Sequence, residues 1–156
     1  MKYVHFFLIL LVLIGCQKVQ PPTGLPPLVP CKVKVHDNGN PLANISVSFQ
    51  RIEGHGGWSL NGMTGSDGVA VAKTIAGSYE ARGLPIGMYR VTLIESIELP
   101  PELINDDDPT MSKKQQKYFA EHCTVPEILR DPSKTPLELT VTESGVEWDV
   151  DIAKFK

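Results

Sequence analysis

The sequence predicts an all-β protein, an antiparallel β-sandwich of about seven strands with one short helix inserted near residues 112–122. Several short segments alternate apolar and polar side chains, which is the period of a half-buried strand. The 13 glycines and 13 prolines among 156 residues favour many turns over long helices. The chain is long enough for one domain with a hydrophobic core after a short N-terminal leader.

The chain opens with an apolar segment. Residues 6–14, FFLILLVLI, follow Lys2 and contain no polar side chain. A helix needs about 20 apolar residues to span a bilayer, so this run is too short and has instead the length of the apolar region of a signal peptide. We expect residues 1–15 to be a signal peptide, with a buried N-terminal core helix as the alternative.

Residues 13–16, LIGC, resemble a bacterial lipobox. The resemblance implies cleavage before Cys16 and lipidation of its thiol and of the newly formed amino group, and two or more acyl chains anchor a protein stably to a membrane. The residue after the cysteine is Gln17 and not an aspartate, which resembles the sorting signal of outer-membrane rather than inner-membrane lipoproteins. We therefore expect a protein of the cell envelope, lipid-anchored on the outer face of a membrane, with the outer membrane favoured. The alternative is an ordinary cleaved signal with an incidental cysteine.

The segment after Cys16 has the composition of a tether. Residues 17–30, QKVQPPTGLPPLVP, contain five prolines, which favour an extended, semi-rigid chain. We expect residues 16–30 to hold a domain of residues 31–156 away from the lipid. Without residues 1–15 the chain has 14 basic and 18 acidic side chains, a net charge of −4, so it lacks the basic field that nucleic-acid binding needs.

Residues 37–40, DNGN, predict the first turn, because Asp, Asn and Gly accept positive φ and close hairpins readily. Apolar and polar side chains alternate before the turn in residues 32–36, KVKVH, and after it in residues 45–49, ISVSF. We expect these two strands to pair as a hairpin that starts the antiparallel domain.

Turns and alternating segments continue along the chain. Residues 64–68, TGSDG, and residues 83–87, GLPIG, are typical turn sequences, and residues 88–94 form the clearest strand. Residues 137–141 and 146–152 alternate in the same way and predict a closing hairpin. The remaining expected strands are short and cover residues 58–63, 69–73 and 78–81.

The segment between residues 95 and 124 differs from the rest. Ser112 with Gln115 three residues later is the pattern of a capping box, so we expect a helix from there to about His122. Residues 105–109, NDDDP, predict a solvated acidic turn. A calcium site is the alternative, but the stretch lacks the spaced oxygen ligands and the closing glutamate of a calcium loop.

Four stretches together resemble a known family: residues 39–49, GNPLANISVSF, residues 64–68, residues 84–92, LPIGMYRVT, and residues 125–137, VPEILRDPSKTPL. They resemble the carboxypeptidase regulatory-like domain, a transthyretin-like, immunoglobulin-like β-sandwich, and in particular the short exported lipoproteins of planctomycete-type bacteria. Leu129 departs from the pattern, which usually has an aromatic residue there. Because these motifs are turn sequences, the resemblance implies a fold and names no ligand.

Two cysteines, Cys31 and Cys123, remain beyond Cys16. An exported domain lies where disulfides persist, and a bridge between the two would stabilise the fold by about 3–5 kcal/mol in the chain-entropy model. Two buried free thiols are the alternative, because a sequence does not give the spacing that a disulfide requires. The chain has no CxxC motif and no paired histidines, so we expect no metal site.

The chain contains no motif of a serine hydrolase, a zinc protease or a phosphate-binding loop. We expect no enzyme activity, no cofactor, and surface positions for His36, His55 and His122. The resemblance extends to one enzyme of similar architecture, the transthyretin-like hydroxyisourate hydrolase. The tail at residues 153–156, AKFK, lacks the Tyr-Arg-Gly-Ser ending of that enzyme.

The leading hypothesis is a non-catalytic binding or structural module that contacts an envelope protein or a polysaccharide. Trp58, in a glycine-rich loop, is the candidate platform for a sugar, with a core position as the alternative. A second hypothesis is an envelope hydrolase with a dispersed site of His36, His55 and nearby acids. A third is an accessory subunit of a secretion or polysaccharide-degrading system.

Overall fold

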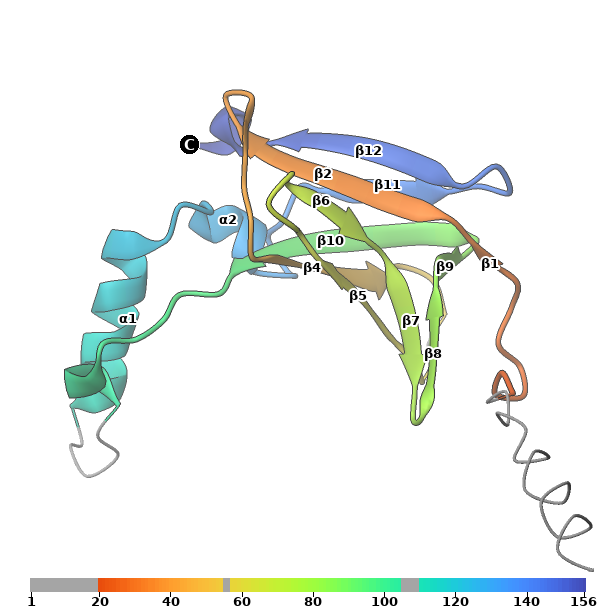
Figure 1. Ribbon diagram of the computed structural model, residues 1–156, viewed down its shortest axis with the longest axis horizontal. Helices are drawn as coiled ribbons and strands as arrows, with labels where there is room; N and C mark the ends of the chain where they lie inside the picture. Colours follow the sequence, from red (N-terminus) through yellow and green to blue (C-terminus); the bar gives the residue numbers. More distant parts are fainter. Residues whose placement is uncertain (1–19, 55–56, 105–109) are drawn as a thin grey trace, which may run out of the picture.

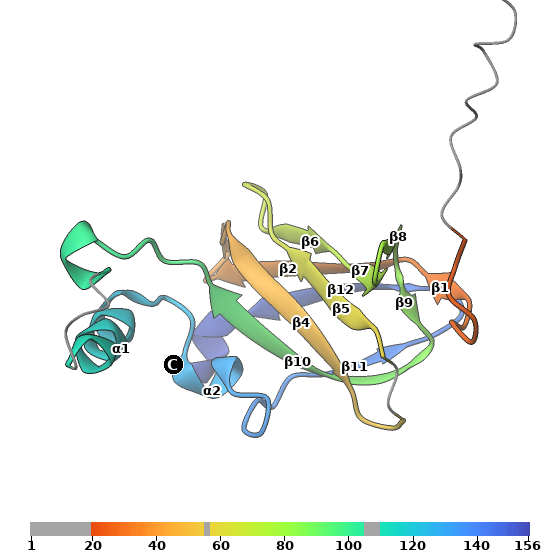
Figure 2. The same ribbon diagram turned by 90° about the horizontal axis from the view of Figure 1, so that it is seen from below.

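The computed structural model describes residues 20–54, 57–104 and 110–156. The predicted signal peptide, Cys16, His55 and the acidic stretch 105–109 lie outside these residues. Figures 1 and 2 show two β-sheets that pack face to face around the core, so the predicted all-β sandwich is confirmed. No helix in the described part of the chain has the length and apolar character to cross a membrane.

The larger sheet has six antiparallel strands. In spatial order they are β11 (Glu138–Val141), β10 (Gly87–Glu95), β4 (Ile45–Arg51), β5 (Ser59–Met63), β7 (Lys73–Ala76) and β8 (Tyr79–Arg82). The smaller sheet has the order β12 (Val146–Asp151), β2 (Cys31–Asp37) and β3 (Asn40–Pro41), and β6 (Val69–Val71) also pairs with β2. A two-stranded sheet joins β1 (Leu28–Val29) to β9 (Leu84–Pro85).

The central strands β2, β4 and β10 bury the side chains that the alternation assigned to one face. Burying a Val, Leu, Ile or Phe side chain stabilises a fold by roughly 1.5–3 kcal/mol, so these rows of apolar residues hold the two sheets together. At most 6% of each of the following residues is exposed: Cys31, Val33, Val35, Ile45, Val47, Phe49, Tyr89, Val91 and Leu93.

The first turn forms as predicted but joins different strands. Asn38 and Gly39 have φ values of 50° and 84°, the two positive values of a two-residue hairpin turn. This hairpin connects β2 to the short β3, after which the chain crosses to the larger sheet. There β4 pairs with β10 and β5, so the expected hairpin between β2 and β4 is wrong. Asn44, with a φ of 60°, immediately precedes β4 at this crossing.

The expected closing hairpin is also wrong. β11 pairs antiparallel with β10 in the larger sheet, whereas β12 pairs parallel with β2 in the smaller one. The Val146 N–H donates a hydrogen bond to the Pro30 carbonyl at 2.9 Å and thereby aligns β12 with β2. Gly145 has a φ of 76°, and a Cβ there would lie 2.5 Å from the Pro30 oxygen, so this position requires glycine.

Two expected boundaries move. The strand predicted at residues 69–73 is divided into β6 and β7, because the chain leaves the smaller sheet at Ala72 and enters the larger one. The end of the predicted tether belongs to the folded domain, since residues 28–29 pair as β1 with β9. β9 in turn occupies part of the predicted turn at residues 83–87.

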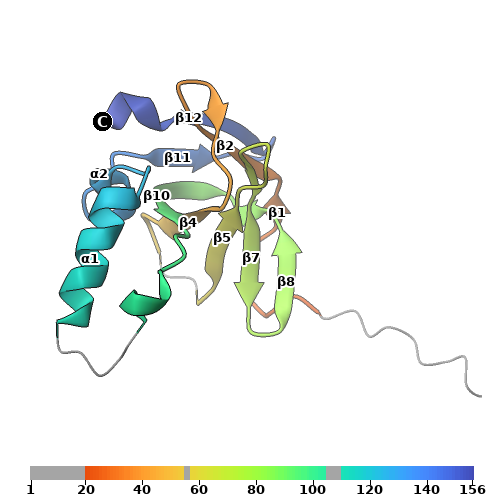
Figure 3. The same cartoon turned by 60° about the vertical axis from the view of Figure 1, so that its left-hand side comes forward.

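The helix α1 spans Met111–His122, which confirms the predicted helix. The capping box is wrong: the N-cap is Thr110, so Ser112 lies inside the helix, and the Gln115 Nε2 donates to the Leu103 carbonyl at 2.7 Å. Figures 1 and 3 show α1 standing away from the sandwich. The structure adds a one-turn helix that was not predicted, α2 (Glu127–Arg130), and two 3-10 turns at Pro101–Leu103 and Ile152–Phe155.

Candidate binding cleft

The pairing between β4 and β5 ends before either strand does. The last paired residues are Ser48 and Asn61, whereas β4 continues to Arg51 and β5 begins at Ser59. Over these lengths β4 keeps β10 as its other neighbour and β5 keeps β7. The edges of β4 and β5 that face each other therefore carry backbone N–H and C=O groups outside strand pairing, where water or a ligand can bind them.

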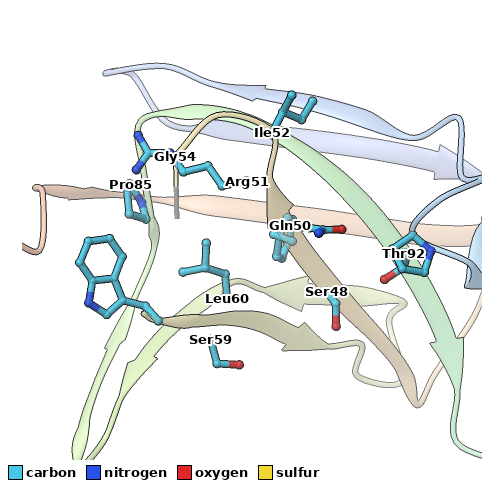
Figure 4. Close-up of a pocket in the computed structure, with 12 residues that line it drawn as sticks. Ser48, Gln50, Arg51, Ile52, Gly54, Ser59, Leu60, Pro85 and Thr92 are labelled. Atoms are coloured by element: carbon cyan, nitrogen blue, oxygen red, sulfur yellow. The ribbon is translucent and has the colours of Figure 1, made fainter. Parts of the chain in front are cut away.

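A cleft occupies this opening between the strands (Figure 4). Its volume of about 560 Å³ lies within the roughly 300–1,000 Å³ of small-ligand sites. Phe49 and Leu60, from the buried faces of β4 and β5, line its apolar side together with Pro85 of β9. Four uncharged polar side chains also line the cleft: Ser48, Gln50, Ser59 and Thr92.

Trp58 immediately precedes β5 and lines the cleft. Its side chain is half-buried and also packs against the hydrophobic core. Trp58 therefore both packs against the core, which was the alternative considered for it, and lines a cavity. Large aromatic side chains of this kind provide rigid contact surface that is apolar on one side and solvated on the other. Contact between Trp58 and a sugar stays a prediction.

Arg51 ends β4 on the inward-facing side of the strand and also lines the cleft. Its Nη2 donates to the Ile86 carbonyl at 3.2 Å, and Figure 4 shows the side chain extending from β4 toward β9. Burial raises the pKa of Tyr89, its register partner on β10, and the Arg51 charge opposes this rise. Ion pairs between described residues are all made by lysines or by His36, so no described carboxylate neutralises Arg51.

Arg90 brings a second guanidinium group to the same region. It pairs in register with Gln50, and its Nη1 donates to the Pro132 carbonyl at 3.3 Å. Arg51, Arg90, Gln50 and Ile52 line a smaller hollow of about 180 Å³, which shares all of these residues except Arg90 with the cleft. As for Arg51, none of the ion pairs between described residues involves Arg90.

Among the residues of this region, the sequence pointed to Trp58 but not to Arg51 or Arg90. The strand pattern contained an indication for Arg51, which follows Ile45, Val47 and Phe49 in the inward-facing position. A charge is costly to bury, so an inward-facing arginine at a strand end predicts a position at the rim of the sandwich. Arg90 occupies an ordinary outward-facing position, and nothing in the local pattern distinguishes it.

His36 lies at the end of β2 among the carboxylates of β12. Its Nε2 donates to the Asp149 Oδ1 at 2.5 Å, and its Nδ1 accepts from the Gly39 N–H at 3.0 Å. The Asp151 Oδ1 lies 3.6 Å from the same Nδ1. Both ring nitrogens are thus hydrogen-bonded to groups of the protein itself.

Of the other two histidines of the domain, His55 and His122, the structure describes only His122. His55 lies outside the described residues, so its part in the hydrolase hypothesis stays a prediction. His122 ends α1, where its Nδ1 donates to the Tyr118 carbonyl at 2.9 Å and its ring stacks on the Tyr118 ring at 4.0 Å. In the described part of the chain, no three His, Cys, Asp or Glu side chains gather to hold a metal ion.

Of the two alternatives left open for Cys31 and Cys123, a bridge or two free thiols, the structure has the free thiols, with Cys31 buried and Cys123 half-buried. Cys31 is close enough to Tyr89, near the start of β10, to affect its pKa, whereas the Thr124 N–H bonds to the Glu95 Oε2 at the far end of that strand. The two thiols are therefore associated with opposite ends of β10.

Comparisons of this chain with protein-family models, with curated proteins and with solved structures found no match.

Proposed function

We propose that this chain is a lipid-anchored, non-catalytic β-sandwich of the cell envelope that binds polysaccharide through the cleft between β4 and β5. The observation that carries the proposal is the position of Trp58, whose half-buried ring lines an opening between two strands with unpaired edges. A sugar ring has apolar faces and a polar rim. An aromatic ring beside backbone and side-chain hydrogen-bonding groups is therefore a suitable surface for it.

The anchor in this proposal is supported by the sequence, through the lipobox at residues 13–16 and the apolar segment before it. The proline-rich residues before β1 would separate the domain from the lipid. We also assign the domain to the carboxypeptidase regulatory-like, transthyretin-like group. The assignment is supported by the two-sheet architecture and by the positive φ of Gly39 and Gly68 in the motif turns.

The test uses residues 17–156 without the lipid, because β1 belongs to the fold. The immobilised protein is exposed separately to isolated wall polysaccharide and to solubilised envelope proteins. We expect capture of polysaccharide, and we expect Trp58→Ala to abolish it while circular dichroism still shows a folded protein. In the full-length protein made by an exporting bacterium, we expect the intact mass to include acyl chains on Cys16.

Trp148→Ala is the matched control. Trp148 on β12 is a half-buried tryptophan that packs against the same core and lies outside the cleft, so its loss should lower stability and leave capture unchanged. Polysaccharide capture that survives Trp58→Ala, or capture of envelope protein alone, would contradict the proposed site. An unacylated Cys16 would contradict the anchor.

A further inference from the structure

The arginines of this protein are distributed differently from its other cationic side chains. The ion pairs between described residues are made by lysines and His36, as in Lys32–Glu147 at 2.8 Å and Lys73–Glu80 at 2.7 Å, and none is made by an arginine. Two of the four arginines, Arg51 and Arg90, line the cleft or the hollow that adjoins it. The cleft therefore has positive charge that no described carboxylate neutralises.

Both guanidinium groups are held in place with most of their donors unused. Arg51 donates to the Ile86 carbonyl and Arg90 to the Pro132 carbonyl, one hydrogen bond each, and both side chains are only partly exposed. A guanidinium has five N–H donors in a planar fork that fits a carboxylate in a bidentate arrangement. Fixing the side chain beforehand reduces the conformational entropy lost when a ligand binds.

We propose that the cleft selects acidic polysaccharides, whose uronic-acid carboxylates bind Arg51 and Arg90 while a sugar ring lies against Trp58. This inference rests on the polysaccharide-binding function proposed above and names its ligand class. Partial burial of the arginines strengthens an ion pair relative to one in open water, since the local dielectric is lower. The hydroxyl and amide groups of Ser48, Gln50 and Ser59 bind the ring hydroxyls.

The net charge of the whole chain does not favour binding of an acidic polymer, so the proposed selectivity depends on the residues of the cleft. Without residues 1–15 the net charge is −4, so a polyanion is repelled by the molecule at long range. In this proposal the attraction to an acidic polymer comes from Arg51 and Arg90 and is confined to the cleft and the adjoining hollow. It should also weaken as salt shortens the screening length from about 10 Å at 0.1 M toward about 3 Å at 1 M.

The experiment pairs each acidic polymer with its neutral counterpart. Residues 17–156 are titrated by calorimetry with polygalacturonate, alginate and hyaluronate, and with the carboxyl-reduced form of each. We expect at least one acidic polymer to bind and its reduced form to bind at least tenfold more weakly. Arg51→Gln and Arg90→Gln should each lower the affinity for the acidic polymer by roughly 10- to 100-fold, which corresponds to the loss of one hydrogen bond to a charged group. Each substitution should weaken binding of the reduced form by a smaller factor than binding of the acidic form.

Arg82→Gln is the matched control, because Arg82 lies on β8 outside the cleft and should not affect binding. Arg51→Lys keeps the positive charge but not the planar set of guanidinium donors, so it should bind the acidic polymer more tightly than Arg51→Gln and more weakly than the unchanged protein. Such partial recovery would show that Arg51→Gln removes a contact to the ligand and does not unfold the protein. Equal binding of acidic and reduced polymers that still requires Trp58 overturns this inference and leaves the proposed function standing. Absence of binding to every polymer overturns the inference, and absence of capture of wall polysaccharide overturns the proposed function as well.

Discussion

At the scale of single residues, Tyr89 connects the core to the cleft. Its hydroxyl donates to the Pro85 carbonyl at 2.6 Å, and its ring meets Phe49 edge to face with centroids 6.4 Å apart. Tyr89 itself is fully buried, whereas Phe49 and Pro85 line the cleft. The same side chain therefore fills the sandwich and supports the wall of the cleft.

Cys31 and Cys123 provide a prediction at this scale. Burial raises the pKa of Cys31 to about 11, so at pH 8 about 0.1% of it is thiolate, and the residue is only 1% exposed. In residues 17–156 without reductant, we expect Cys31 to resist iodoacetamide until the protein is unfolded in guanidinium. Mass spectrometry should then count two adducts.

Cys123→Ala should reduce this count to one adduct in the unfolded protein. If the unreduced, unfolded protein took up no iodoacetamide, the two cysteines would be bridged, which would contradict the free thiols of the structure.

At the scale of elements, the turns decide where a strand begins. Gly68 is the last residue of the turn at residues 64–68 and immediately precedes β6. It has a φ of 73°, and its N–H donates to the Gly65 carbonyl at 3.0 Å. A Cβ at this position would lie 2.6 Å from the Val35 oxygen and 2.9 Å from the Pro41 Cβ. The turn is therefore held against β2 and β3 as closely as a glycine allows.

Gly68→Ala should destabilise the protein by more than the cost of its backbone angle alone, which is about 1–2 kcal/mol. Gly77→Ala is the matched control, because Gly77 has a φ of 61° in the turn between β7 and β8, and a Cβ added there would meet no atom within 4 Å. Urea unfolding would measure both. Equal losses for the two variants would show that the contacts to Val35 and Pro41 relax without cost.

At the scale of the whole molecule, titrating groups limit stability on both sides of neutral pH. Hydrogen bonds from Ser133 lower the pKa of Asp131, a bond from Lys32 lowers that of Glu147, and the Asn38 N–H lowers that of Asp151. A carboxylate with a lowered pKa stabilises the fold above its unfolded pKa, and this contribution is lost as the pH falls.

The thiol acts in the opposite direction. Because burial raises the pKa of Cys31 to about 11, its contribution is fully present below its unfolded pKa and is lost as the pH rises from there toward 11. We expect the melting temperature to be highest near neutral pH, to fall below about pH 4 and to fall again above about pH 9. In Cys31→Ala, the melting temperature should fall less between pH 7 and alkaline pH than it does in the unchanged protein. A melting temperature that rose above pH 9 would contradict the burial of Cys31.

Alternation along the chain determined which side chains form the core. Val33, Val47, Val91 and their neighbours are buried as the period of two required, because that period is a property of the extended backbone whichever strand lies beside it. Glycine and asparagine likewise determined the turn at Asn38 and Gly39, since positive φ is a local preference. The short helix near residues 112–122 was equally local.

Only the tertiary structure decided which strands pair. A strand with one apolar face can bury that face equally well whether the next strand in the sequence pairs with it in the same sheet or lies in the opposite sheet. β4 therefore crossed to the larger sheet, β12 lay parallel to β2, and Cys31 and Cys123 stayed free thiols. The cleft depends on the same decisions, since it exists where β4 and β5 part after Ser48. Arg51 and Arg90 line one hollow there from two strands, and such a juxtaposition is set by strand pairing rather than by neighbours in the sequence.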